Sequence, residues 1–527
     1  MSIYSMHADG TEVHIEPHDE AGVTAELAEE LSRHRTVRAH FGDDEVHVER
    51  VELLDKDLDS SAFEAIVHHR GSCRSAYVTG RVDDLGAVVV RPSAYRPVTT
   101  QAEFGEAVEA ALRDPDVRRM VEQDGFVPYR PMPPYADAQL PDGRWDRIVT
   151  VGLRSDRADL AHRIIGVRVE DGSVIHQLGG VPVPTSDNCE PAPPDQACAP
   201  SAGRDQVRVR VVRGGVTLWD LIVVRPKASS GTNGSGVELR YVDRLGKRVL
   251  YRAHVPILNV EYGAEGVRTG CGPTYRDWQN SEACFHADGT EPVGPGWRVC
   301  TSPPTTILES GHDGGNFRGV ALWYRDGDLR IVSQLQAGWY RYISDWHLLD
   351  DGTIRPRFGF AATANPCTCK PHTHHAYWRF DFDILSASEN IVEEFNDPPI
   401  IGNSNWHTKL YEIRRSRDAS HKRHWRVRHA GTYTGYDIVP GSNDGTADAY
   451  GVGDVWVLRY HGNELDDGHG FTTNPVYSRA DLDPFVNGER VDGQDVVLWY
   501  AGHFLHDEGH PAPGGHIVGP DLRPFNW

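Results

Sequence analysis

No apolar run in the 527-residue sequence approaches the length of a membrane-spanning helix. The opening residues MSIYSMHADGTEVHIEPHDE lack a basic region followed by an apolar core, so we expect no secretory signal and a cytoplasmic protein. Basic residues are outnumbered, since 54 Lys and Arg stand against 76 Asp and Glu and give a net charge of −22. Nucleic acids and anionic membranes both reward clustered Lys and Arg, so we expect neither as a partner. Eight cysteines in so long a chain do not make a disulfide scaffold, although the sequence leaves one or two disulfide bridges as an alternative.

Helical patterns are confined to the first quarter of the chain. A short amphipathic segment covers Val23 to His34, and apolar residues recur at helical spacing from Thr99 to Phe126. Strand-like runs such as EVHVERVELL lie between them. We therefore predict an N-terminal segment over residues 1–34 that contains a short helix, followed by a small α+β module over residues 35–126.

A proline-rich stretch follows, and we interpret residues 127–145 as a linker. From residue 146 onward, short alternating strands such as QVRVRVVRGG and DVVLWYAGHF are separated by Gly, Asp and Pro turns. The composition of 53 Gly and 34 Pro agrees with many strands and turns. The predicted fold is mainly β, with a large antiparallel β-sandwich domain over residues 146–527 preceded by the small α+β module.

The 27 histidines invite a search for metal ligands, and PHTHH at Pro371 to His375 is the densest group. In a strand, residues two apart share a face, so His372 and His374 point the same way, about 6 to 7 Å apart along the chain. His375 points to the opposite face. A third ligand must come from elsewhere, and spacing alone does not choose among four C-terminal histidines: His503, His506, His510 and His516. Such a set of imidazoles with open coordination suits copper or zinc.

These segments resemble the catalytic domain of copper amine oxidases that contain topaquinone. In that family the H-x-H strand continues to an Arg and an Asp, as at Arg379 and Asp381 here. The family's third copper histidine lies seven residues after the Trp of a DIVLW-type strand, ahead of a tail with a PF dipeptide. DVVLW followed by His506, and the final PFNW, match this pattern. The resemblance thus implies that His372, His374 and His506 bind copper.

Segments that resemble the family occur in the family's order over most of residues 35–527. This resemblance identifies the chain as a divergent bacterial-type member of the family. It implies a homodimer, in which hairpin arms embrace the partner and the region from Trp406 to Gly435 supplies one such arm. It also implies a small-molecule amine as substrate and O2 as the second substrate.

One tyrosine in this family becomes topaquinone, within a G-N-Y-D/E-Y motif that lies six residues before a Trp. GWYRYISDWHLLDDGTI, Gly338 to Ile354, matches this segment and makes Tyr340 the implied cofactor precursor. Two neighbours that border the cofactor depart from the motif, because Trp339 replaces the asparagine and Arg341 replaces the acidic residue. A cation at Arg341 favours a substrate that carries a carboxylate.

The family's catalytic base is an Asp in an F-D-x-G-E stretch, which this sequence lacks. Its task needs a carboxylate within hydrogen-bonding reach of the proton that is removed. Asp277, Glu282 and Asp288 lie in the corresponding region, although none aligns cleanly. We take Asp277 as the catalytic residue and keep the other two as alternatives.

The cysteines add two further expectations. Cys367 and Cys369, just before the histidines, are read as packed thiols, with copper delivery or a disulfide as alternatives. The family often has a disulfide in the region of Cys271, Cys284 and Cys300, so one pair there is a further expectation.

The resemblance yields three functional hypotheses. The first is a copper-dependent primary-amine oxidase that uses a quinone from Tyr340, forms an aldehyde and releases hydrogen peroxide and ammonia. The second is a copper-dependent oxidase or oxygenase of a specialised biosynthetic pathway that does not use topaquinone, motivated by Trp339, Arg341 and the missing base motif. The third is a non-catalytic homologue. We rank them in this order.

Overall fold

The computed structural model describes residues 4–527 except for a set of short segments: 9, 19–20, 43–45, 54–60, 70–71, 73, 94–96, 98, 100, 131–134, 140–144, 156–159, 161–162, 169–170, 177–196, 263–273, 364–367, 369–370, 463, 469–478, 481 and 507–516. Nearly all strand pairs in it are antiparallel, and β18 with β19 is a parallel pair. The prediction of a mainly β fold is confirmed. Among the described residues, no helix is long and apolar enough to cross a membrane.

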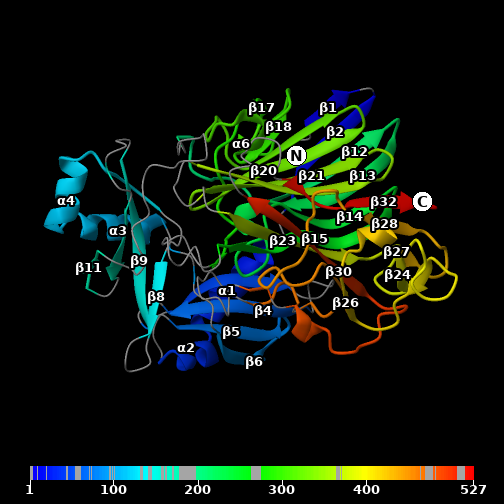
Figure 1. Cartoon of the computed structure of the whole chain (residues 1–527), viewed down its shortest axis with the longest axis horizontal. Coiled ribbons are helices and arrows are strands. Elements are labelled where there is room, and N and C mark those ends of the chain that lie inside the picture. The colour runs from blue at the N-terminus through cyan, green and yellow to red at the C-terminus, as the bar shows by residue number, and fades with distance from the viewer. Residues whose placement is uncertain are drawn as a thin grey trace.

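Two large sheets dominate the molecule (Figure 1). The first, called the β15 sheet, has the strand order β1 (Tyr4–Ala8), β2 (Thr11–Pro17), β12 (Gln206–Arg213), β13 (Val216–Val224), β14 (Glu238–Arg244), β15 (Lys247–Glu261), β23 (His372–Phe382), β30 (Val496–His506), β29 (Val455–Arg459) and β26 (Ile413–Arg415), with β16 (Thr274–Arg276) also paired to β15. The second, called the β21 sheet, has the order β17 (Gly289–Thr290), β18 (Trp297–Cys300), β19 (Val320–Arg325), β20 (Asp328–Ala337), β21 (Tyr340–Leu349), β22 (Ile354–Ala362), β32 (Asp521–Phe525), β28 (Gly435–Val439), β27 (His424–His429), β24 (Asn390–Phe395) and β25 (Trp406–Thr408), with β31 (Ile517–Val518) also paired to β22.

One hydrophobic core joins the two sheets. Trp219 and Trp378 from the β15 sheet belong to the same buried cluster as Trp346 and Phe358 from the β21 sheet, and each is at most 1% exposed. Because successive side chains of a strand point to opposite faces, each strand can give one set of side chains to this core. The molecule is therefore a β-sandwich, and residues on the inner faces of β21 and β23 lie between its sheets.

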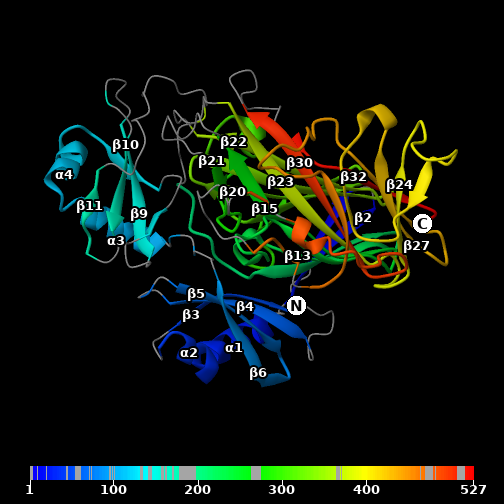
Figure 2. The same ribbon diagram turned by 60° about the horizontal axis from the view of Figure 1, so that its bottom comes forward.

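Two smaller α+β units lie beside the sandwich (Figures 1 and 2). One packs α1 (Ala21–Arg33) and α2 (Arg35–His40) on a sheet of β3 (His47–Leu53), β4 (Ala62–His69), β5 (Arg74–Arg81) and β6 (Asp84–Ser93). The other packs α3 (Gln101–Ala111) and α4 (Pro115–Glu122) on β7 (Val127–Tyr129), β8 (Tyr135–Gln139), β9 (Trp145–Arg154), β10 (Arg163–Arg168) and β11 (Val174–Ile175). Short helical turns elsewhere are η1 (Pro226–Ala228), α6 (Ile307–Ser310), η3 (Ala419–His421) and η4 (Asp483–Phe485).

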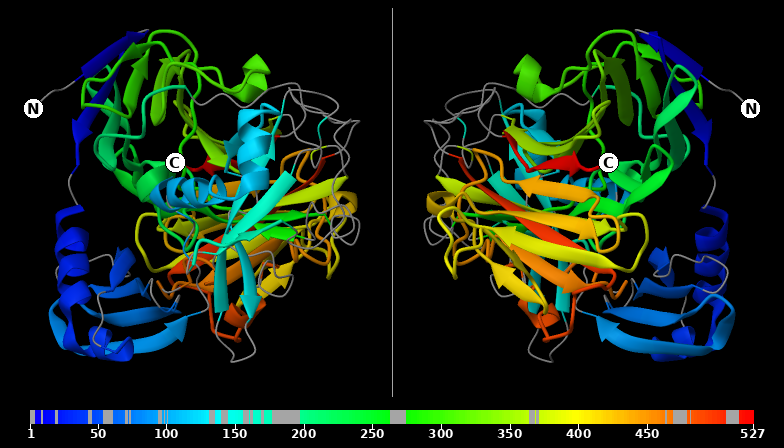
Figure 3. Two further views of the ribbon diagram at one scale, coloured as in Figure 1. Left: turned by 90° about the vertical axis from the view of Figure 1, so that its left-hand side faces the viewer. Right: turned by 90° about the vertical axis from the view of Figure 1, so that its right-hand side faces the viewer.

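This arrangement differs from the domain boundaries expected from the sequence. β2 pairs with β12 and β1 pairs with β2, so these two strands extend the sandwich before the chain leaves for α1 (Figure 3). The helices expected within 99–126 pack on β9 and β10, not on the sheet of residues 47–93. The expected linker, residues 127–145, carries β7 and β8. A proline fits in β7 because β7 is an edge strand. We propose two small α+β units, over residues 21–93 and 101–176.

The helical pattern before Phe126 is interrupted by a capping residue. Asp114 accepts hydrogen bonds from the backbone N–H groups of Asp116 (2.9 Å) and Val117 (3.1 Å), and Pro115 opens the new helix. An aspartate cap followed by proline is a strong start signal for a helix. The expected single run is therefore two helices, α3 and α4.

The structure pairs Cys284 with Cys198 in a disulfide, 86 residues apart in the sequence. Cys300 is a free, buried thiol, which corrects the expectation of a bridge among Cys271, Cys284 and Cys300. Cys271, Cys367 and Cys369 lie outside the described residues.

Candidate metal centre

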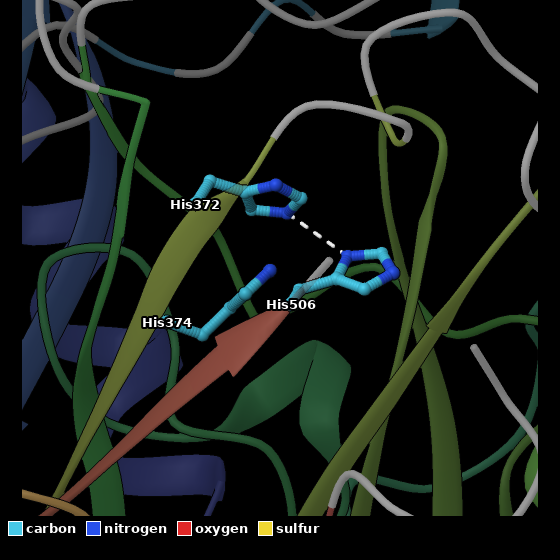
Figure 4. Close-up of side chains that lie close together, drawn as sticks. All are labelled: His372, His374 and His506. Carbon is cyan, nitrogen blue, oxygen red and sulfur yellow. Dashed lines mark hydrogen bonds between the residues drawn. The ribbon is translucent and has the colours of Figure 1, made fainter. Parts of the chain in front are cut away.

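Three histidines converge on the inner face of the β15 sheet. β23 and β30 run antiparallel, and their register places His372 directly opposite His506. His374 lies two residues further along β23 and therefore shares the face of His372. One ring nitrogen of each histidine lies within 4.8 Å of the others, and all three side chains are buried (Figure 4). The structure thus brings together the three residues that the sequence singled out.

The geometry of this cluster suits a copper or zinc ion. His372 Nε2 and His506 Nδ1 lie 3.0 Å apart, so two ring nitrogens already face one point. Phe360 stacks on His374 with the ring centroids 3.8 Å apart, which fixes the orientation of that imidazole. Three buried imidazoles with no carboxylate among them form a donor set that copper and zinc accept, with positions left for further ligands. The residues present fit the metal.

Tyr340 opens β21 and faces the histidine cluster across the core. Its Oη lies 2.6 Å from His372 Nε2, and its ring meets His374 edge to face at 4.8 Å. The side chain is fully buried, and this burial raises the pKa of Tyr340 well above its usual value. The phenol is therefore held neutral, in direct contact with a histidine of the cluster.

Tyr262 is a site residue that the sequence reasoning did not single out. Its Oη shares a hydrogen bond with Tyr340 Oη, and its ring stacks on His372 at 4.4 Å. Trp339 Nε1 also lies within 3.3 Å of Tyr262 Oη, to which it donates. Its position follows from the strand register, because Glu261 pairs with Thr373 and the next residue of the chain therefore lies beside His372. No spacing of residues in the sequence signals this register.

Asp277 lies beside the tyrosines. It follows β16, which pairs with the end of β15, and only 1% of the residue is exposed. Tyr342 Oη donates a hydrogen bond of 2.5 Å to Asp277 Oδ2, and Tyr342 packs against Tyr340 with the ring centroids 5.6 Å apart. The other oxygen, Oδ1, has no hydrogen-bond partner among the described residues. Burial raises the pKa of Asp277 to about 8.

The two alternative carboxylates are engaged elsewhere. Glu282 is buried in an ion pair with Arg225, whose Nε lies 2.7 Å from Oε1. Asp288 is exposed at the edge of the β21 sheet and accepts a hydrogen bond from Asn316 at 3.1 Å. Of the three carboxylates considered, Asp277 is the one that contacts the tyrosines.

Arg341 departs from its expected role. Its Nε and Nη2 lie 2.7 and 2.8 Å from the two oxygens of Asp313, and Nη1 donates to the carbonyls of Gly338 and Tyr340. Neighbouring residues of a strand point to opposite faces, so Arg341 points away from the side of Tyr340. It fixes the turn that precedes Tyr340, and it offers no cation to a substrate carboxylate.

Replacing Arg341 with methionine is expected to destabilise the sandwich by about 3 to 5 kcal/mol, because the buried carboxylate of Asp313 loses the guanidinium that compensates its charge. Substituting both partners, as Arg341→Met with Asp313→Leu, should recover most of this loss. The urea midpoint of tryptophan fluorescence measures both effects. As a control, Arg490→Met removes the more exposed pair with Asp492 and should change stability by less than about 1 kcal/mol. Equal midpoints for the single and double variants would contradict the role of this pair.

No protein-family model matches the sequence, and no curated protein does. Solved structures do match over nearly the whole chain. A copper-containing benzylamine oxidase from Hansenula polymorpha is 14% identical, with 97% of each chain covered and a TM-score of 0.59. The lysyl oxidase of Pichia pastoris is 12% identical, with 99% of this chain and 91% of that chain covered and a TM-score of 0.57. An Aspergillus nidulans amine oxidase is 13% identical, with 100% and 90% covered and a TM-score of 0.51. The chain therefore has the fold of these amine oxidases.

Proposed function

We propose that the protein is a copper-dependent amine oxidase that uses a quinone derived from Tyr340. The observation that carries this proposal is the 2.6 Å contact between Tyr340 Oη and His372 Nε2, inside a buried cluster of three histidines. Copper with O2 supplies the oxidation that converts a tyrosine into topaquinone, and that quinone supplies the two-electron oxidation of an amine. The overall reaction turns a primary amine, O2 and water into an aldehyde, ammonia and hydrogen peroxide.

Each residue of the site has a distinct task in this proposal. His372, His374 and His506 hold the metal. Tyr262 holds the phenol oxygen of Tyr340 through its hydrogen bond, and the indole of Trp339 donates to Tyr262 in turn. The chain thereby fixes the orientation of the reactive ring before substrate arrives.

Asp277 is the proposed base, which takes a proton from the carbon that bears the amine. Its uncommitted oxygen, Oδ1, is the atom that accepts this proton, while Tyr342 holds the other oxygen in place. A buried carboxyl with a raised pKa is suited to proton transfer near neutral pH. Because Arg341 is bound to Asp313, the proposal carries no preference for substrates with a carboxylate.

Mass spectrometry of the peptide from Gly338 to Trp346 tests the proposal, with a protease that does not cut at Arg341. Protein loaded with copper and exposed to air should show a gain of about 30 Da on this peptide, from two oxygens added and two hydrogens removed. His506→Ala protein treated in the same way should show none. An unmodified peptide in copper-replete wild-type protein would contradict the proposal and favour an oxidase whose reaction occurs at the copper site itself.

The homodimer stays a prediction. Large apolar side chains are exposed in the segments just before and just after β25, among them Ile401 at 70% and Tyr411 at 58%. Exposed apolar groups of this size support a contact with a second copy of the chain. The cytoplasmic location also stays a prediction, and the Cys198–Cys284 disulfide argues against it, since disulfides persist mainly in oxidising compartments.

A further inference from the structure

The outer face of the same strand pair carries a second cluster that the proposed oxidase chemistry does not use. His375 follows His374 on β23 and points away from the copper site, where it pairs in register with His503 of β30. One ring nitrogen of His375 and one carboxylate oxygen each of Glu261 and Asp448 lie within 4.8 Å of one another. These residues come from the end of β15, from β23 and from the segment before β29.

With His503 neutral, its hydrogen bonds assign the nitrogen of His375 that carries the proton. His503 Nε2 lies 3.0 Å from the carbonyl oxygen of Gly453, so that nitrogen is a donor. The other nitrogen of a neutral His503, Nδ1, is then an acceptor, and it lies 2.9 Å from His375 Nδ1. His375 Nδ1 therefore donates, and His375 Nε2 keeps its lone pair. Within the described part of the chain this buried nitrogen has no hydrogen-bond partner.

The groups that face this nitrogen are also acceptors. Asp448 Oδ2 lies 3.5 Å from His375 Nε2, while Asp448 Oδ1 is fixed by the backbone N–H groups of Tyr450 and Gly451 at 2.8 and 2.7 Å. Burial, the charge of Asp448 and a hydrogen bond between the two carboxyl groups raise the pKa of Glu261 to about 7. Once Glu261 has lost its proton, the imidazole lone pair and the two carboxylates repel one another unless a cation lies between them.

We propose that Glu261, His375 and Asp448 bind a divalent transition-metal ion, with Zn²⁺ the ion that fits the donors best. One imidazole and two carboxylates are ligands that zinc takes, and their charge balances that of the ion. Donation by the far nitrogen of a ligating histidine, as from His375 to His503, is the usual support for such a ligand. Asp448 is partly exposed, which leaves a side open for the ion and for water.

The surrounding backbone is shaped around His375. A Cβ atom on Gly451 would lie 2.0 Å from His375 Nδ1, so only glycine allows the segment from Asp448 to approach the imidazole this closely. An ion held here would join three distant segments at the outer face of the sandwich. Because Glu261 precedes Tyr262, the same ion would fix Tyr262 in its contact with Tyr340. The proposed zinc ion would thus stabilise the position of Tyr262 from the outer face of the sheet.

Zinc titration of the metal-free protein by calorimetry tests this inference in a His372→Ala/His506→Ala background, which removes the copper cluster. Calcium is kept in excess to occupy a group made of carboxylates alone, Asp381, Asp383 and Asp495. The background protein should bind one zinc ion, and adding Glu261→Gln with Asp448→Asn should abolish this binding. His503→Phe should weaken it by about 10- to 100-fold.

An exposed cluster of the same residue types, Asp114, Asp116 and His176, provides the control. Asp116→Asn in the same background should leave zinc binding unchanged. The inference is overturned if the background protein binds no zinc, if the Glu261→Gln/Asp448→Asn variant keeps it, or if Asp116→Asn removes it. Circular dichroism of each variant shows whether it is folded, and Gly451→Ala provides an independent variant that keeps all three ligands and should lose the ion. None of these readouts depends on amine oxidation, so either proposal can fail alone.

Discussion

Replacing Tyr340 with phenylalanine is expected to abolish quinone formation and amine oxidation together, while the protein keeps its copper. Phenylalanine fills the same buried space but lacks the oxygen that lies 2.6 Å from His372 Nε2. If the quinone does the chemistry, the whole rate enhancement is lost, a factor of at least about 10⁶. Copper content by elemental analysis, the mass of the peptide from Gly338 to Trp346, and hydrogen peroxide release measure the three quantities separately.

Tyr342→Phe is the matched control for this substitution. Tyr342 lies on the same strand and face as Tyr340, and its loss removes an oxygen of the same kind, which donates to Asp277 and lies 3.3 Å from His374 Nδ1 but does not contact His372. This variant should still acquire the quinone. Undiminished turnover by the Tyr340→Phe protein would contradict the proposed function, and the reaction would then have to occur at the metal without a quinone.

Two of the three clustered histidines were predictable because their geometry is local, since alternation along one strand places His372 and His374 on a single face. Spacing did not separate His506 from the other C-terminal histidines, and only the resemblance to copper amine oxidases selected it; the structure then places it directly opposite His372. The same alternation assigned His375 to the other face. The sandwich was predictable for a similar reason, since apolar and polar residues alternate within each strand and this pattern can be read from the strand alone.

Other features depend on contacts between distant segments, which no spacing encodes. Arg341 could be placed on the face opposite Tyr340, but its partner Asp313 comes from a loop before β19. Cys198 reaches Cys284 across 86 residues. The position of Asp277 rests on the pairing of β16 with β15, and the chain between these strands includes residues outside the described part. Only the folded structure shows that Asp277 contacts Tyr342, whereas Glu282 and Asp288 have other partners.

The Asp277→Asn substitution is expected to lower amine oxidation by about 10²- to 10⁴-fold, the usual contribution of a general base. The mass gain on the peptide that contains Tyr340 should persist, because Asp277 has no part in holding the metal. Asp288→Asn should leave the rate nearly unchanged, and Glu282→Gln should destabilise the protein through Arg225 without removing the base. A full rate in the Asp277→Asn protein, or the same loss in the Asp288→Asn protein, would assign the base elsewhere.

The pH dependence of kcat/KM provides a second test of Asp277 as the base. Burial raises the pKa of Asp277 to about 8, so the carboxylate is available as a base only as the pH rises, and kcat/KM should rise to a plateau above about pH 8. The hydrogen bond donated by Tyr342 lowers the pKa of Asp277, so Tyr342→Phe should move this rise to higher pH. A profile that is flat from about pH 6 to 9 would contradict a catalytic base with a pKa of about 8.

The same raised pKa predicts that the Asp277→Asn variant gains stability where it loses activity. Unfolding returns the Asp277 carboxyl to a pKa of about 4, so between about pH 4 and 8 the folded protein holds a proton that the unfolded chain has released. The stabilising effect of that proton is complete below about pH 4 and is lost as the pH rises through about 8. An asparagine has no such titration, so the urea midpoint of the variant should exceed that of the wild type by a margin that grows with pH and levels off above about pH 8. A margin independent of pH would mean that the pKa of Asp277 is not raised by folding, and any rise of kcat/KM towards pH 8 would then have to come from another group.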